Sequence, residues 1–231
     1  MPRPTVSHAR VRVWDLPTRL FHWALAACLI GMFATAWWPG GALTWHSRFG
    51  YSVLALLVFR LAWGLGGGYW SQWRRMALSP ARAWRYLRGR PTAEDLVGHS
   101  PLGSLSVFAL MVILGAQLAT GLVTDDQIAF TGPLNRFVST DTGLAATSWH
   151  KRVGQWLVLG WIGLHLAAIA WYQFKLRRPL VQAMLHGDKE LPAELANDLQ
   201  RSRDNLGTRL AAAGVFAACV GAVVAVVRLG H

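Results

Sequence analysis

Residues 149–165 read WHKRVGQWLVLGWIGLH, an apolar run with one histidine near its start, His150, and another at its end, His165. On an α-helix, a separation of fifteen residues gives a rise of about 22 Å and a net rotation of about 60°. The two imidazoles therefore project to the same side of one helix, near opposite edges of a bilayer core about 30 Å thick. Histidine inside a membrane span needs a partner, and a metal is the commonest strong one. The stretch thus predicts a membrane helix with two ligand positions.

The opening hexapeptide of this run occurs twice in the chain. Residues 149–154 read WHKRVG and residues 45–50 read WHSRFG, so the pattern W-H-x-R-x-G precedes two different apolar segments. Two similar turns of this kind can hold one cofactor between them. The repeat makes His46 the counterpart of His150.

The composition indicates an integral membrane protein. Of the 231 residues, 53% are hydrophobic and 13 are tryptophan. The two cysteines, Cys28 and Cys219, lie in apolar runs; there is no C-x-x-C-H motif for covalent haem, and too few thiols for an iron–sulfur cluster. The basic N-terminus leads into an apolar segment without a small-residue cleavage site, so we expect a retained first span rather than a signal peptide.

Five apolar segments approach the roughly 20 residues needed to cross a bilayer. They are residues 20–38, 46–65, 102–123, 149–174 and 210–227. The pattern predicts an all-α integral membrane protein with five transmembrane helices. Asp15, just before the first span, is expected to be a helix N-terminal or turn residue rather than a proton carrier.

Three of the connections between these spans carry local sequence signals. Residues 69–100 contain an amphipathic piece, residues 79–89, expected to lie at the membrane surface. Residues 124–148 are expected to form an outer loop with turns at 132–133 and 141–143. The polar residues 187–205 are expected to form a short helix or a linker.

The net charge of +12 follows the topology rather than a nucleic-acid site. With the N-terminus in the cytoplasm, 18 of the 23 Lys and Arg residues fall in inner segments and 5 fall outside. The outer connection instead carries Asp125, Asp126 and Asp141. This asymmetry predicts a cytoplasmic N-terminus and a periplasmic C-terminus, and a basic inner surface that favours anionic lipid.

Four of the eight histidines lie in or at the edges of spans, and the topology pairs them by depth. His46 pairs with His150 near the outer side, and His22 pairs with His165 near the inner side. Bis-histidine ligation of two b-type haems needs this arrangement of two helices at each depth. A single histidine at a span edge is often only an interfacial polar residue, but four at two depths favour haem. The remaining four are expected to be solvated: His8, His99, His186 and His231.

Other residues near these histidines are candidates for contact with the cofactor. Gly50 and Gly154 each follow an outer histidine by one turn, where a missing side chain lets a flat macrocycle approach the backbone. Basic side chains can neutralise haem propionates, namely Arg48, Lys151 and Arg152 at the outer site and Arg19 and Arg60 at the inner site. The alternatives are helix packing for the glycines and snorkelling for the basic residues.

Several stretches carry a recognisable pattern: RVWDLPTRLFHW at 12–23, WHSRFGY at 45–51, LLVFRLAWG at 56–64 and HKRVGQWLVLGWIGLHLAAIAWYQF at 150–174. Together they resemble the bacterial cytochrome b561 family, which includes the b-type cytochrome subunits of nickel–iron hydrogenases. GLVTDDQIAFTGPLNRFVS at 121–139 and RRPLVQAMLHG at 177–187 are similar to it as well. The resemblance implies one haem-binding domain, residues 1–187, followed by a polar linker and an additional helix, residues 188–231.

The resemblance implies a four-transmembrane-helix di-haem bundle plus a fifth helix, in the bacterial inner membrane. The ligand positions fall on the same four residues, His22, His46, His150 and His165. Such proteins pass electrons between a periplasmic redox protein, such as a c-type cytochrome or a hydrogenase-like subunit, and the membrane quinone pool. No motif places the quinone site in this chain.

Two other functions remain as alternatives. Some members of the family resemble self-contained oxidases of superoxide that reduce quinone, and a cationic outer entrance made of Arg48, Lys151 and Arg152 suits an anionic substrate. A haem-free anchor or transporter predicts no haem at all, and the chain lacks the Gly/Pro-broken paired helices of many transporters. We expect an electron-transfer subunit rather than a stand-alone enzyme.

Overall fold

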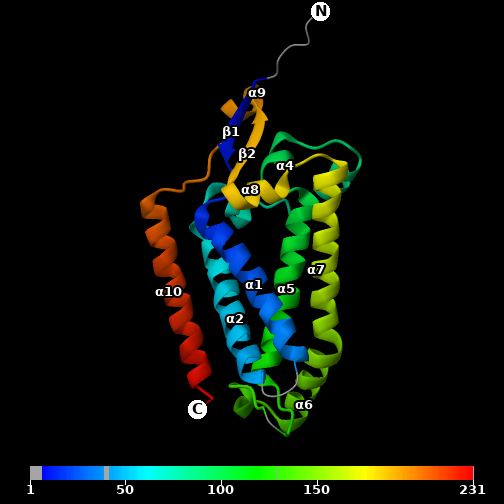
Figure 1. Ribbon diagram of the computed structural model, residues 1–231, viewed down its shortest axis with the longest axis vertical. Helices are drawn as coiled ribbons and strands as arrows, with labels where there is room; N and C mark the ends of the chain where they lie inside the picture. Colours follow the sequence, from blue (N-terminus) through cyan, green and yellow to red (C-terminus); the bar gives the residue numbers. More distant parts are fainter. Residues whose placement is uncertain (1–6, 39–41, 129, 231) are drawn as a thin grey trace, which may run out of the picture. The chain divides into compact units, whose positions relative to one another are not determined.

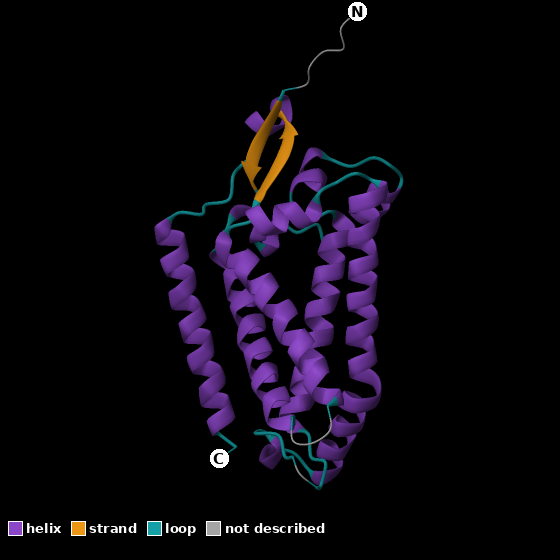
Figure 2. Cartoon of the chain, viewed as in Figure 1, coloured by secondary structure: helices purple, strands orange, loops and turns teal. Residues whose placement is uncertain are grey.

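The computed structural model describes residues 7–38, 42–128 and 130–230, and it is predominantly helical (Figures 1 and 2). Within these residues, five helical segments are long and apolar enough to cross a membrane. They are Leu16–Trp37, Leu43–Gly66, Pro101–Val123, Thr140–Lys175 and Leu206–Arg228. The all-α membrane fold expected from the hydrophobic pattern is therefore confirmed. His231, expected to be solvated, lies outside the described residues.

Helix α1 (Leu16–Trp37) begins directly after a buried carboxylate, that of Asp15. Asp15 Oδ1 accepts a hydrogen bond from the backbone N–H of Thr18 at 3.0 Å, which satisfies one of the free donors at a helix start. Its other oxygen accepts from Trp63 Nε1 at 3.0 Å and from the Gly68 N–H at 2.7 Å. The expected role of Asp15 as the residue that starts the helix is confirmed, and the same carboxylate ties the helix start to the segment around Trp63.

The fourth span begins earlier than the sequence pattern predicts. It consists of α6 (Thr140–Trp149), the π-helical turn η4 (His150–Gly154), α7 (Gln155–Ala170) and a second π-helical segment, η5 (Trp171–Lys175). The expected turn at residues 141–143 is wrong, because Ser139 caps a helix there and its Oγ accepts from the Thr142 N–H at 3.3 Å. An acidic residue in the first turn, Asp141, also favours the helix.

The described chain divides into two compact units, each built from three separate stretches. The first unit comprises Met1–Leu20, Ala62–Val107 and Ala167–Ala212, and the second comprises Phe21–Leu61, Phe108–Leu166 and Ala213–His231. Both units draw on the chain before and after residue 187, and the domain boundary expected at that residue stays a prediction.

The second unit has an apolar core to which four helices contribute: α1, α2 (Leu43–Gly66), α5 (Pro101–Val123) and α7. Its buried residues are Leu29, Val53, Leu57, Leu114, Leu118 and Val158. Helix α10 (Leu206–Arg228) packs against this unit, since the Phe216 ring lies edge-on to Phe59 of α2 with centroids 5.7 Å apart. The fifth span is therefore in contact with the bundle rather than separate from it.

The first unit contains the only strands in the described part of the chain, β1 (His8–Arg12) and β2 (Asp188–Pro192), which pair antiparallel. The sequence pattern predicts a short helix or linker where β2 lies, because a strand formed by pairing with a segment about 180 residues away leaves no local signal. The core of this unit is formed by Val11, Val13, Trp14, Trp70, Val97, Ala183, Leu191 and Ala196.

Short helices complete the connections of the chain. The expected amphipathic piece forms α3 (Pro80–Leu87), which is capped by Ser79, whose Oγ accepts from the Arg82 N–H at 3.4 Å. The other short elements are η1 (Tyr69–Ser71), η2 (Trp73–Arg75), α4 (Ala93–Val97), η3 (Asn135–Phe137), α8 (Leu180–His186) and α9 (Ala193–Asn197).

Candidate functional site

The four span histidines all belong to the second unit, where they form two pairs. The rings of His46 on α2 and His150 at the start of η4 have centroids 6.2 Å apart and planes inclined at 82°. The rings of His22 on α1 and His165 on α7 have centroids 6.4 Å apart and planes inclined at 51°. The structure thus brings together the same partners that the topology pairs by depth.

The spacing of each pair suits two imidazoles on opposite sides of one metal ion. Two metal–imidazole bonds of about 2 Å and two ring radii of about 1 Å place the ring centres about 6 Å apart. Among the described residues, no group of three or more His, Cys, Asp or Glu side chains could hold a metal ion. Two imidazoles alone leave a metal under-coordinated, and a haem macrocycle supplies the missing four nitrogens. The residues present therefore fit haem better than a free ion.

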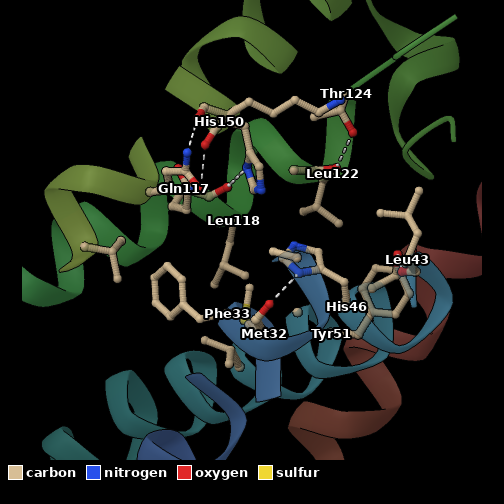
Figure 3. Close-up of a pocket in the computed structure, with 18 of the residues that line it drawn as sticks. Met32, Phe33, Leu43, His46, Tyr51, Gln117, Leu118, Leu122, Thr124 and His150 are labelled. Carbon is tan, nitrogen blue, oxygen red and sulfur yellow. Dashed lines mark hydrogen bonds between the residues drawn. The ribbon is translucent and has the colours of Figure 1, made fainter. Parts of the chain in front are cut away.

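The His46–His150 pair lines a cavity of about 440 Å³ (Figure 3). Its walls are mainly apolar and include Met32, Phe33, Leu43, Leu118 and Leu122. Such a volume lies within the range of cofactor sites, about 300–1,000 Å³, and mostly apolar walls with a few polar groups are typical of them. The cavity is therefore suited to a flat, largely apolar group held at its centre by two imidazoles.

Each imidazole at the cavity has its Nδ1 engaged by a backbone carbonyl. His46 Nδ1 lies 3.0 Å from the carbonyl oxygen of Met32, and His150 Nδ1 lies 2.9 Å from that of Gln117 (Figure 3). Because a carbonyl oxygen can only accept, each Nδ1 carries the proton and each Nε2 keeps its lone pair. Metal-bound histidines usually show this arrangement, which orients the ring and raises its basicity. Both rings are thus in the tautomer that iron ligation requires.

The second pair, His22 and His165, has a different environment. The Nδ1 atom of His22 is buried and has no hydrogen-bond partner in the structure. Buried imidazole nitrogens are normally satisfied, so an orphaned one marks a position where a further group is expected. This orphaned nitrogen is consistent with a bound group at the second pair.

Helix α5 contributes no histidine but forms a cradle for His150 through Gln117, Thr120 and Gly121. Gln117 Nε2 donates to the His150 carbonyl oxygen at 3.0 Å, and Thr120 Oγ1 lies 3.3 Å from His150 Nδ1. A Cβ at Gly121 would lie 3.0 Å from His150 Cε1, a tight contact, so the absence of a side chain there gives the ring space. Sequence reasoning missed these residues, although a lone amide in an otherwise apolar span is a usable signal.

The two candidate glycines have different surroundings. Gly50 lines the cavity, and an added Cβ would have only Met32 Cε within 4 Å, at 4.0 Å. Gly154 is buried and does not line the cavity, and an added Cβ there would overlap the Gln117 side chain. Gly154 therefore makes room for Gln117 of α5, which corresponds to the helix-packing alternative rather than to close approach of a macrocycle.

The five basic residues expected near haem propionates differ in their surroundings. Lys151 is exposed and lines the cavity beside His150, whereas Arg152 is exposed and does not line it. Arg48 stacks over the Trp45 ring, with its Cζ 4.8 Å from the ring centroid. Arg60 on α2 is only 3% exposed.

Arg19 belongs to the other unit and has partners there. Its Nη1 donates to the Leu185 carbonyl oxygen at 2.5 Å, and its Nη2 lies 3.8 Å from Asp204 Oδ2. The structure thus gives Arg19 contacts within the first unit, where it joins the start of α1 to the segment before α10, and its expected role at a propionate stays a prediction.

The histidines expected to be solvated are only partly so. His8 and His186 are exposed, as expected. His99 is half-buried, and its ring packs against Trp14 with centroids 4.6 Å apart, so the expectation for this residue is wrong. The loop around His99 is packed against the apolar core of the first unit, which a local sequence pattern does not reveal.

Comparison with known proteins gives a consistent result. The family model described as prokaryotic cytochrome b561 matches residues 13–187, a region that contains both histidine pairs. The probable Ni/Fe-hydrogenase 1 B-type cytochrome subunit of Escherichia coli (strain K12) is 23% identical over 182 residues, covering 63% of this chain and 76% of that protein. The probable Ni/Fe-hydrogenase B-type cytochrome subunit of Azotobacter vinelandii is 24% identical over 204 residues, covering 76% and 78% respectively. No solved structure matches the chain.

Proposed function

The chain belongs to the prokaryotic cytochrome b561 family, and we propose that it binds two haem b groups and carries electrons across the membrane. Membership confirms the resemblance seen in the sequence and makes the chain a multi-pass membrane b-type cytochrome. One observation carries the proposal of two haems: two histidine pairs, each from two helices, have ring centroids 6.2 Å and 6.4 Å apart.

The proposed ligands are His46 and His150 for one haem and His22 and His165 for the other. When bound, each haem supplies a one-electron couple. The chain's own residues orient the ligands through the Met32 and Gln117 carbonyls and line the site with apolar side chains that exclude water. Gly50 would leave space for the macrocycle, and Lys151 is the basic candidate placed to neutralise a propionate at the cavity.

We further propose that the chain lies in the bacterial inner membrane with a cytoplasmic N-terminus and a periplasmic C-terminus. The uneven distribution of Lys and Arg supports this orientation. The His46–His150 haem would then lie towards the periplasm, and the His22–His165 haem would pass electrons to or from quinone. Because the relatives are named as hydrogenase cytochrome subunits, we propose a hydrogenase-like periplasmic partner, with a c-type cytochrome as the alternative.

One observation favours a second candidate function, a self-contained superoxide:quinone oxidoreductase. Lys151 is both exposed and part of the cavity that holds His46 and His150, so it can attract a small anion towards that pair. The isolated chain would then reduce a soluble quinone when superoxide is supplied, without any partner protein. An electron-transfer subunit would show no such activity until its redox partner is added.

The first experiment is a haem-to-protein ratio on the detergent-purified chain, with reduced-minus-oxidised spectra. We expect two b haems in the wild type, and the loss or disruption of a different haem in His46→Ala and in His165→Ala. His99→Ala is the matched control, because His99 is a half-buried histidine outside both pairs. A wild-type chain that keeps its fold but binds no haem would refute the proposal, and a single haem would show that one pair is misassigned.

A further inference from the structure

Gln117 contacts His150 through both its backbone and its side chain. Its carbonyl oxygen lies 2.9 Å from His150 Nδ1, and its Nε2 donates to the His150 carbonyl oxygen at 3.0 Å. The residue is only 8% exposed, although it lies in an otherwise apolar part of α5. Burying an amide in a membrane span costs free energy, so a glutamine at this position indicates a specific interaction.

The contact is made at the π-helical turn His150–Gly154. Such turns are rare and frequently mark functional sites, because they shift the direction of the side chains that follow and precede them. Gln117 Nε2 binds the carbonyl of the first residue of this turn, and its Oε1 lies where a Cβ of Gly154, the last residue of the turn, would be. One amide therefore contacts both ends of the turn, and the glycine provides the space for it.

The neighbouring positions of α5 support the same arrangement. Thr120 Oγ1 donates to the Gln117 carbonyl oxygen at 2.9 Å, the atom that also accepts from His150 Nδ1. Gly121 leaves the space occupied by the His150 ring. At a spacing of three and four residues, positions 117, 120 and 121 lie on one face of α5. His46 is held differently, since its Nδ1 lies 3.0 Å from the Met32 carbonyl oxygen, a backbone contact.

We propose that Gln117 is a positioning residue for the haem held by His46 and His150. Its amide holds the π turn and thereby fixes the plane of the His150 ring, which is inclined at 82° to that of His46. The inference rests on the proposed di-haem function and adds a residue from a helix that supplies no ligand. Because the relative orientation of the two ligand planes and the basicity of the imidazole both influence a ferric haem, Gln117 sets its spectroscopic signature and its potential.

The test uses the full-length chain in detergent with four variants. Gln117→Leu removes the amide at similar size, and Gly154→Ala displaces the amide without changing it. The double variant Gln117→Leu/Gly154→Ala closes a double-mutant cycle. Ile113→Leu, on α5 and packed against the same apolar core without lining the cavity, controls for a change of packing without loss of a hydrogen bond. The readouts are the electron paramagnetic resonance spectrum, the midpoint potential and the retention of each haem.

We expect both single variants to change the low-spin ferric signal of one haem and to raise its midpoint potential, because a less firmly held Nδ1–H···O bond makes the imidazole a weaker donor. Affinity for that haem should fall about tenfold, at the lower end of the effect of removing a partner that orients a ligand. Retention of the other haem, at His22 and His165, would show that the fold is intact. The double variant should be no worse than the more severe single variant, since both changes remove the same contact.

Two outcomes overturn this inference. One is a Gln117→Leu protein whose two haems match those of Ile113→Leu in signal and potential. The other is equal loss of both haems in Gln117→Leu and Gly154→Ala, which would show a role in general stability only. Failure of the proposed di-haem function would give a different result, because the wild-type chain itself would then bind fewer than two haems.

Discussion

Replacing Asp15 by alanine should destabilise the protein more than any exposed acidic substitution. The carboxylate is completely buried and accepts three hydrogen bonds, from the Thr18 N–H, from Trp63 Nε1 and from the Gly68 N–H. All three donors belong to the first compact unit. The substitution removes the cap of α1 and leaves two buried donors without an acceptor.

The magnitude follows from these contacts. Loss of a helix cap costs about 1 kcal/mol. Each buried donor left unsatisfied costs about 1–3 kcal/mol, and the two effects are not strictly additive. We therefore expect Asp15→Ala to lower the free energy of unfolding by about 4 kcal/mol, which at roughly 2–4 °C per kcal/mol corresponds to a fall in the melting temperature of about 10 °C.

The assay is thermal unfolding of the purified protein in detergent, followed by tryptophan fluorescence. Asp15→Asn separates the contributions, because Asn keeps an acceptor for the Thr18 N–H but turns an NH₂ group towards Trp63 and Gly68. It should be nearly as unstable as Asp15→Ala. Asp141→Ala is the control, since Asp141 is exposed in the first turn of α6. A loss for Asp15→Ala no larger than for Asp141→Ala would refute the reasoning.

Three further predictions address other positions. Gly121→Ala should weaken the haem at His46–His150 and spare the other, because its Cβ would lie 3.0 Å from His150 Cε1; reduced-minus-oxidised spectra would test this, and equal loss of both haems would contradict it. Gly187→Ala should destabilise the first unit by about 1–3 kcal/mol, because φ at Gly187 is +90° and an added Cβ would lie 2.5 Å from the Trp14 carbonyl oxygen. Melting curves would measure this loss of stability. Gly214→Ala is the control, since nothing lies within 4 Å of a Cβ added there. Burial, and then the nearby charge of Arg178, lowers the pKa of Lys189 from 10.5 to about 8. Because this folded-state pKa lies below that of the unfolded chain, the wild type should gain stability as pH rises from about 8 to about 10.5, and Lys189→Met should lack that gain in melting curves across this range.

Much of the architecture could be predicted from local sequence, because a membrane span has to be apolar along its whole length. The five spans are therefore visible as hydrophobic runs, and His22, His46, His150 and His165 stand out as polar exceptions within them. Their pairing follows from the alternation of helix direction. This is why the two close ring pairs of the structure coincide with those expected from topology.

The remaining features depend on contacts between distant segments. The cradle on α5 arises where Gln117 meets His150; a lone amide in an apolar span marks the position, but the local sequence does not identify its partner. The start of the fourth span at Thr140 lies in a stretch that is polar enough to read as a loop. The π turn is equally hidden, since its five residues have ordinary helical composition and the extra residue is accommodated only in the folded helix.

The pairing of β1 with β2 constrains the order in which the protein can be completed. Residue pairs such as His8 with Pro192 and Arg12 with Asp188 join the start of the chain to a segment that follows the fourth span. During synthesis, β1 therefore waits without a partner while four spans enter the membrane. Val11 and Val13, fully buried in the finished protein, belong to a core that is complete only once Leu191 of β2 has been made. Closure of this ladder therefore has to wait until the ribosome has synthesised the chain past the fourth span.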